Sequence, residues 1–234
     1  MGYKVAIVGA TGKVGLVMLD ILAERAFPAD EVVALASRRS QGKEVSFGDK
    51  TLKVKALENY DFSDTDICLM SAGGDASKKW SPKIGAQGCV VIDNSSAWRY
   101  DSEVPLIVPE VNPDAIVGFS KKNIIANPNC STIILLMALA PLHAAAGLRR
   151  IIVSTYQSVS GAGAKAVAQL DRESRALLRQ IRVEASGLHL KAKAGGRGGA
   201  TVLPAQIAFN VIPQVDAFLA SRATREEAKM AQET

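Results

Sequence analysis

The 234-residue sequence predicts an α/β fold built on a parallel sheet. A short β-branched run at residues 4–8 is followed by a glycine-rich turn and then by apolar residues at helical spacing. A second helix is expected at residues 75–86. Strands that alternate with helices form a parallel sheet covered on both faces. Further strand-like runs occur at residues 51–57, 65–71, 89–93 and 105–111.

Three glycines at three-residue spacing mark the first turn, "VAIVGATGKVG". Gly9 permits a tight turn, Gly12 lets the backbone approach a pyrophosphate, and Gly15 allows close packing of helix on strand. The helix N-terminus is then placed to hold the anion. The spacing does not fit a P-loop, because Ile7 and Val14 stand where that motif needs Gly and Ser or Thr. The first half therefore predicts a Rossmann-type dinucleotide-binding domain.

The end of the predicted second strand, in "EVVALASRRSQGK", predicts the cofactor. An NAD site usually has an acidic residue here for the ribose 2′-hydroxyl, whereas this chain has Ser37, Arg38 and Arg39. Arginine and hydroxyl groups suit a 2′-phosphate through charge-assisted hydrogen bonds. The segment predicts NADP, and the alternative is a solvated basic loop.

Two other polar segments follow predicted strands. "SAGGDASKKW" is a glycine turn at the carboxyl end of a strand, where ligands bind in open α/β sheets. "DNSSAWRYD" places Arg99 among hydroxyl residues. Arg99 could clamp a phosphate or carboxylate, or form a surface ion pair, and both interpretations stay open.

Cys130 stands where the polar turn "NPN" meets a long apolar run, which predicts a buried helix. A thiol in the first turn of a helix lies beside unsatisfied N–H groups that favour a thiolate. The alternative is a small core residue. Cys68 and Cys89 lie inside apolar runs and are interpreted as core residues.

Composition excludes several classes of protein. The net charge of +5 favours anionic small molecules, but no aromatic-basic pattern points to nucleic acid. Three widely spaced cysteines predict neither a metal site nor a disulfide framework, and they fit a reducing cytoplasm. The sequence shows no apolar run of about 18 residues and no secretory signal, so no membrane segment is expected.

The second half continues with a predicted strand from residue 148 that ends at Gln157 and Ser158, followed by a glycine-rich turn and a long helix. Residues 184–202 predict an exposed loop, and apolar alternation returns at residues 204–218. Thr224 and Glu227 form a capping box that starts a last helix. This helix has no stop signal before the chain ends, which suggests a C-terminal truncation.

Several segments together resemble the aspartate-semialdehyde dehydrogenase family. They are "VAIVGATGKVG", "LASRRSQGK", "SAGG", "VIDNSSAWRYD", "VPLIVPEVN", "IIANPNCSTI", "YQSVSGAGAKA", "QIAFNVIPQVD" and "EEAKMAQET". The resemblance implies an NADP-binding Rossmann-type domain at residues 1–128. An α+β catalytic and dimerisation domain, incomplete at its C-terminus, would follow at residues 129–234. It implies NADPH-dependent reduction of L-aspartyl-4-phosphate to L-aspartate 4-semialdehyde by a cytoplasmic homodimer, in the biosynthesis of lysine, threonine, methionine and diaminopimelate.

The resemblance also implies roles for single residues. Cys130 matches the nucleophile and Gln157 the residue that positions the acyl intermediate. Arg99 and Asn129 match phosphate-binding positions, and Glu233 matches the residue that receives the substrate amino group. The implied cofactor-binding residues are Gly9, Thr11, Gly12, Lys13, Val14, Gly15, Ser37, Arg38, Ser71, Gly73, Ser158 and Gly161.

The chain departs from the family pattern in two places. A lysine, an arginine and the acid–base histidine that follow the glutamate in the family have no counterpart, and neither His143 nor His189 stands in the histidine motif. The stretch 186–203 does not match. The 234-residue chain alone is therefore expected to turn over little. The alternatives are an N-acetyl-gamma-glutamyl-phosphate reductase and a non-catalytic NADP-binding or dimerising protein.

Overall fold

The computed structural model describes residues 2–183 and 202–234, which form two compact units. The first unit comprises Met1–Ile151 together with Gln232–Thr234, and the second comprises Ile152–Ala231. The sequence places its domain boundary at 128/129, and that division stays a prediction.

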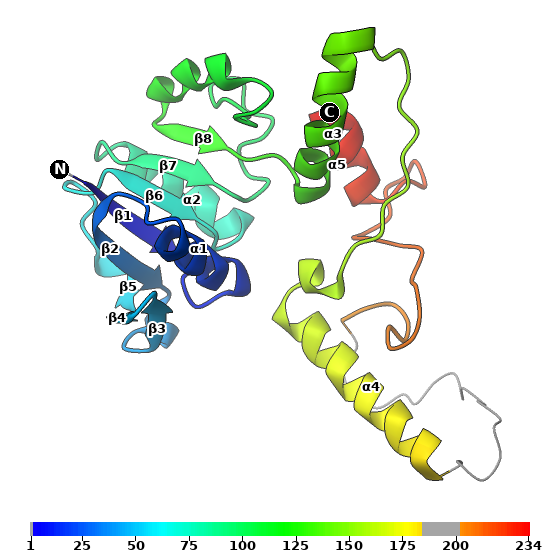
Figure 1. Ribbon diagram of the computed structural model, residues 1–234. Coiled ribbons are helices and arrows are strands. Elements are labelled where there is room, and N and C mark those ends of the chain that lie inside the picture. Colours follow the sequence, from blue (N-terminus) through cyan, green and yellow to red (C-terminus); the bar gives the residue numbers. More distant parts are fainter. Residues whose placement is uncertain (1, 184–201) are drawn as a thin grey trace. The chain divides into compact units, whose positions relative to one another are not determined.

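The first unit is built on a six-stranded sheet in which every neighbouring pair is parallel. The strand order reverses at β1, because β2 pairs on one side of it and β6 on the other (Figure 1). The predicted α/β fold with a parallel sheet is confirmed. In order across the sheet, the strands are β5 (Lys55–Ala56), β2 (Ala29–Ala36), β1 (Tyr3–Val8), β6 (Ile67–Met70), β7 (Val90–Asp93) and β8 (Ile124–Ala126).

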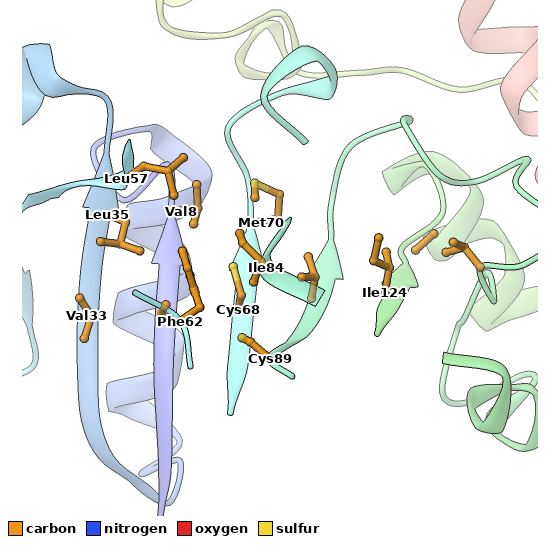
Figure 2. Close-up of a cluster of buried hydrophobic side chains, with 14 residues drawn as sticks. Val8, Val33, Leu35, Leu57, Phe62, Cys68, Met70, Ile84, Cys89 and Ile124 are labelled. Atoms are coloured by element: carbon orange, nitrogen blue, oxygen red, sulfur yellow. The ribbon is translucent and has the colours of Figure 1, made fainter. Parts of the chain in front are cut away.

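Helices pack on both faces of this sheet. Alternate residues of a strand face opposite sides, and Val8 packs in one buried cluster with Ile84 of α2 (Gly74–Gly85). Ile7 packs in a second cluster with Leu19 of α1 (Lys13–Glu24). Figure 2 shows the first cluster, which contains Cys68 as well as Cys89. The prediction that these two thiols belong to the core is confirmed.

Shorter elements surround the sheet. The run at residues 51–57 does not form one strand, since it divides between a hairpin and the sheet edge. The hairpin contributes Val45 to the buried cluster that contains Leu19 of α1. The hairpin consists of the antiparallel strands β3 (Glu44–Phe47) and β4 (Lys50–Lys53). The other short elements of this unit are the 3₁₀ turns η1 (Arg38–Ser40), η2 (Leu57–Asn59) and η3 (Pro113–Lys121).

The predicted strand at residues 105–111 is wrong. Only a single bridge forms there, between Leu106 and Ala126. Prolines at 105 and 109 lack the N–H that a ladder needs, and the N–H of Val108 donates to the Asn112 side chain at 2.9 Å. β8, which the sequence did not predict, completes the sheet instead.

The apolar run after Cys130 forms α3 (Cys130–Ala146), as predicted, but the expected burial is wrong. Only Thr132 of this helix is buried, whereas Ile134 is 73% and Leu142 55% exposed. The helix is apolar on every side, so elements on one side alone cannot cover its surface.

The second unit contains η4 (Val159–Ala162), the predicted long helix α4 (Ala164–Val183) and most of α5 (Arg225–Glu233). The predicted capping box opens α5, with the Glu227 N–H donating to Thr224 Oγ1 at 3.3 Å. The strand predicted from residue 148 does not form, and the described part of this unit contains no strand. A lone extended segment cannot satisfy its own backbone, so the local pattern does not suffice there. The loop expected at 184–202 lies, except for Val202, outside the described residues.

Candidate functional site

The turn between β1 and α1 has the geometry that its glycine spacing predicts. Gly9 has φ +90°, and a Cβ there would lie 2.4 Å from the Ser71 carbonyl oxygen. A Cβ at Gly15 would lie 2.3 Å from the Gly9 oxygen, which explains the close approach of α1 to β1. Gly12 is the N-cap of α1, and no side-chain hydrogen bond caps the first turn of the helix, whose N–H groups suit an anion. The other predicted residues of this turn are half-buried Thr11 and exposed Lys13 and Val14.

A second glycine turn lies next to the first. The Ser71 N–H donates to the Val8 carbonyl at 2.9 Å, which ties the end of β6 to the end of β1. Gly73 has φ +89° and is the N-cap of α2. Both turns stand where the strand order reverses, the position at which open α/β sheets bind dinucleotides.

Ser37 and Arg38 lie at the carboxyl end of β2, beside β1. Both are exposed, and Arg38 Nη2 donates to Asn59 Oδ1 at 3.4 Å. Arg39 follows in the same 3₁₀ turn. This end of the strand therefore presents two guanidinium groups at the same edge as the glycine turns.

Cys130 is the first residue of α3, as predicted. Asn129 caps the helix, with its Oδ1 accepting the Ser131 N–H at 2.8 Å. The three thiols differ in access, because Cys130 is exposed and both other cysteines are buried. Burial raises the pKa of Cys68 well above its usual range and raises the pKa of Cys89 to about 12. Cys130 is thus the accessible thiol of this chain.

Arg99 belongs to a buried cluster of polar groups rather than to the surface. Its Nε donates to the Asn127 carbonyl at 2.8 Å, and its Nη2 approaches the Asn94 carbonyl at 3.4 Å. Its Nη1 lies 3.1 Å from Glu233 Oε1, and the two side chains are 7% and 0% exposed. The ion pair that the alternative for Arg99 expects therefore forms, but it is buried and does not lie at the surface.

Glu233 brings this cluster to the start of α3. Its second carboxylate oxygen accepts the Asn129 N–H, one residue before Cys130. Its first oxygen also accepts the Tyr100 hydroxyl at 3.2 Å, and burial and the Glu233 charge raise the pKa of Tyr100. A carboxylate thus occupies the N-terminus of α3, where the helix dipole favours an anion. The structure thus brings together three predicted site residues that lie far apart in sequence: Arg99, Asn129 and Glu233.

The remaining predicted residues lie in the second unit. Gln157 Nε2 donates to Glu226 Oε1 at 2.6 Å, and Glu226 is buried. Ser158 Oγ caps η4, which contains Gly161. Glu226 was not among the predicted site residues, and its one signal in the sequence is its place between Thr224 and Glu227, the two members of the capping box.

Two family models match the chain in sequence order. The semialdehyde dehydrogenase NAD-binding domain matches residues 4–119, and the semialdehyde dehydrogenase dimerisation domain matches residues 139–234. Aspartate-semialdehyde dehydrogenase of Vibrio mimicus is 48% identical over 232 residues, covering 99% of this chain and 69% of the relative.

The chain belongs to the aspartate-semialdehyde dehydrogenase family. Another member, from Aquifex aeolicus, is 51% identical over 235 residues and matches all of this chain. The chain spans 65% of the length of that relative.

Solved structures of the family agree with this assignment. The crystal structure of aspartate semialdehyde dehydrogenase II from Vibrio cholerae has a TM-score of 0.90 and 48% identity, covering 100% of this chain and 65% of that one. A probable aspartate-semialdehyde dehydrogenase from Pseudomonas aeruginosa has a TM-score of 0.80 at 28% identity, with the same coverage. The Rossmann-type first domain and following dimerisation domain are therefore those of the aspartate-semialdehyde dehydrogenase family.

In the part of the chain that the structure describes, no three His, Cys, Asp or Glu side chains gather as a metal site would require. No helix in residues 2–183 and 202–234 combines the length and the apolar character needed to cross a membrane.

Proposed function

We propose that this chain carries the nucleophile and anion site of an NADPH-dependent aspartate-semialdehyde dehydrogenase. The substrate would be L-aspartyl-4-phosphate, and the products L-aspartate 4-semialdehyde and phosphate. One observation carries the proposal: the accessible Cys130 begins α3 beside a buried cluster that already binds a carboxylate through Arg99 and the Asn129 N–H. The relatives' names supply the substrate, and they do not favour the glutamyl-phosphate alternative.

The residues of the first unit fit a dinucleotide. The glycine turn leaves no room for a Cβ at Gly9 or Gly15, and α1 begins with uncapped N–H groups that suit a pyrophosphate. Ser37 and Arg38 suit a 2′-phosphate, and the related Candida albicans structure was determined with NADP. The cofactor supplies hydride when it is bound. Tighter binding of NADPH than of NADH in a fluorescence titration would support this choice, and equal binding would contradict it.

The proposed chemistry of the protein begins at sulfur. The Cys130 thiolate attacks the acyl carbonyl, the C–O bond to phosphate breaks, and a thioester remains on the protein. The N–H groups at the start of α3 can stabilise both the thiolate and the developing oxyanion. Arg99 and Asn129 would hold the leaving phosphate, and Glu233 would leave Arg99 to receive the substrate amino group. Gln157, held by Glu226, would position the acyl group.

The assay is phosphate-dependent formation of NADPH from aspartate semialdehyde, run on this chain and on one extended to the length of the relatives. We expect little turnover from the 234 residues and measurable turnover from the longer chain. Replacing Cys130 with Ser should reduce that turnover by at least about 10³-fold without changing NADPH affinity, because the nucleophile is lost. Turnover that survives the substitution, or that needs no phosphate, would refute the proposed mechanism.

We also propose that the protein forms a homodimer through the part matched by the dimerisation model. Exposed apolar residues of this part support a partner, since Leu142, Ile152 and Val153 are 55%, 84% and 44% exposed. Light scattering should give twice the chain mass at micromolar concentration. A monomer at that concentration would contradict this part of the proposal.

A further inference from the structure

Asp93 is a buried acidic residue to which the proposed mechanism gives no role. It ends β7 and is 0% exposed. Its Oδ1 accepts the Ser95 N–H at 2.7 Å and the Ser95 hydroxyl at 2.6 Å. Its Oδ2 accepts the hydroxyl of Ser77, and the Ser81 hydroxyl approaches the same oxygen at 3.4 Å. Removing a carboxyl group from water is costly unless hydrogen bonds compensate it, and here four do.

These hydrogen bonds fix the turn that carries Arg99. Ser95 Oγ, held by Asp93, accepts the Ala97 N–H at 3.1 Å. At the other end of the turn, Trp98 Nε1 donates to Ser77 Oγ at 2.8 Å. Asp93 and Ser77 therefore hold both ends of residues 95–98, immediately before Arg99.

A second series of hydrogen bonds connects the backbone of Asp93 to the Arg99 guanidinium. Its carbonyl accepts the Asn127 N–H at 2.9 Å, and the Asn127 carbonyl accepts Arg99 Nε at 2.8 Å. The next residue, Asn94, is tied to β6 through the Met70 carbonyl at 3.0 Å, and its own carbonyl receives Arg99 Nη2. The two carbonyl groups that orient the guanidinium are thus anchored at the end of β7.

A neutral amide could not replace this carboxylate without changing the network. A carboxylate only accepts hydrogen bonds, whereas an Asn side chain has one accepting oxygen and an NH₂ group that donates. The NH₂ group would then face either the Ser95 N–H, which can only donate, or the hydroxyls of Ser77 and Ser81, which would have to accept instead of donating. The turn before Arg99 would lose one of its two attachments.

We propose that Asp93, acting with Ser77, is a positioning residue that orients the Arg99 guanidinium toward a phosphate group bound at the start of α3. The inference rests on the proposed function, because it assumes that Arg99 receives the substrate phosphate. It adds that the affinity for phosphate depends on the hydrogen bonds of Asp93 and Ser77. Loosening the turn should weaken phosphate binding even though every group that touches phosphate is retained. A charge-assisted contact to phosphate needs the planar guanidinium in one orientation.

The test uses the full chain, with inorganic phosphate as the probe and alkylation of Cys130 by iodoacetamide as the readout. Mass spectrometry measures the labelling rate at increasing phosphate concentration, at constant ionic strength. The variants are Asp93→Asn and Ser77→Ala, with Arg99→Ala as the reference for a lost anion site. Asp101→Asn is the matched control, because Asp101 lies two residues beyond Arg99 and pairs with Lys122 at 2.7 Å instead. NADPH affinity reports whether each variant is folded.

We expect phosphate to protect Cys130 in the wild type and to lose this effect in Arg99→Ala. Asp93→Asn and Ser77→Ala should raise the half-protecting phosphate concentration by about 10-fold, as expected when one charge-assisted contact is loosened. In these two variants, the labelling rate in the absence of phosphate should stay within about two-fold of the wild-type rate, and so should the affinity for NADPH. Asp101→Asn should match the wild type in every measurement. A purely structural role would lower the melting temperature and leave phosphate protection of the folded protein unchanged.

The outcomes separate the two proposals. If Arg99→Ala abolishes protection while both Asp93→Asn and Ser77→Ala match the wild type, the positioning role is wrong and the phosphate site stands. If phosphate does not protect the wild type, or protects Arg99→Ala equally well, the phosphate role fails and the positioning role fails with it. If Asp93→Asn does not fold, Ser77→Ala decides, because it removes a hydroxyl without leaving a changed group at position 93.

Discussion

The sheet of the first unit and the segment after α4 in the second unit hold their backbones by different means. In the sheet, neighbouring strands supply each other's hydrogen bonds, and side chains such as Ile7 and Leu35 are 0% exposed. In the second unit, Gln169 of α4 accepts the N–H groups of Val202 and Leu203 at 2.8 and 3.1 Å. Glu173, one turn later, accepts those of Ile207 and Ala208 at 2.8 and 3.2 Å.

The difference shows two solutions to one requirement, which is that buried backbone groups need partners. The sheet distributes this requirement over many local strand patterns and a large apolar core. In the second unit, four amides of residues 202–208 instead depend on two polar side chains of α4 that lie more than 30 residues away in sequence. Core substitutions should therefore dominate in the sheet, and single polar substitutions should matter more in the second unit.

The largest contrast should come from one substitution made in each region. Leu35→Ala opens a cavity under β2 and should lower the free energy of unfolding by about 3 kcal/mol. Leu178→Ala on α4 should change it by less than about 1 kcal/mol, because Leu178 is 51% exposed. Urea unfolding followed by circular dichroism measures both. Equal losses would show that Leu178 is covered in solution and would break the comparison.

Substitutions at Gly9 and Gly163 allow the cost of backbone strain to be distinguished from the cost of steric crowding. Gly9 and Gly163 have φ +90° and +88°, but a Cβ at Gly163 meets nothing within 4 Å, unlike one at Gly9. Gly163→Ala should therefore cost only backbone strain, about 1–3 kcal/mol, because a positive φ with ψ 179° is essentially limited to glycine. Gly9→Ala should cost more and also weaken NADPH binding. The same urea series with a fluorescence titration tests this, and equal costs would mean that the contact with Ser71 relaxes freely.

Glu173→Gln should lower stability by about 1–2 kcal/mol at pH 7, because a charged acceptor of backbone N–H groups is lost. Burial opposes ionisation of Glu173, but hydrogen bonds from Gln169 and from two backbone N–H groups lower the pKa of its carboxyl overall. A group with a lowered folded pKa stabilises the protein above its unfolded pKa, about 4.3, and loses this effect as pH falls through the folded value.

The stability difference between wild type and Glu173→Gln should accordingly be constant above about pH 5 and shrink below about pH 4. Urea midpoints between pH 3 and 7 measure it. Asp171→Asn is the matched control on the same helix, since its exposed pair with Arg175 should contribute less than about 0.5 kcal/mol. A pH-independent difference would show that Glu173 is not held as a carboxylate.

The smallest expected effect is at the start of α5. Thr224→Ala removes the hydroxyl of the capping box and should cost about 1 kcal/mol. The N–H and hydroxyl of Thr224 also lower the pKa of the Glu227 carboxyl. Hydrogen exchange of the first-turn amides of α5 should quicken, while that of the sheet amides stays unchanged. Unchanged exchange at α5 would mean that other contacts hold this helix end.

Local patterns were sufficient wherever one segment contains all that its structure needs. The glycine turn at Gly9, the helix that starts at Cys130 and the capping box of Thr224 were predicted because spacing and backbone preference act within a few residues. The core positions of Cys68 and Cys89 followed from the apolar runs that surround them. The family resemblance added Asn129, Gln157 and Glu233 one residue at a time, and it gave a phosphate-binding role to Arg99, which the sequence had already singled out.

Tertiary structure decided everything that needs a partner distant in the chain. Residues 105–111 and the run from residue 148 have strand-like patterns, but no ladder forms there, while β8 pairs with β7 and becomes a strand. The ion pair of Arg99 with Glu233 joins residues 134 positions apart. Sequence alone determined which side chains this protein carries at each turn and helix start. Only the folded chain determined which of them meet, because hydrogen bonds and ion pairs depend on distance in space, and spacing along the chain does not specify that distance.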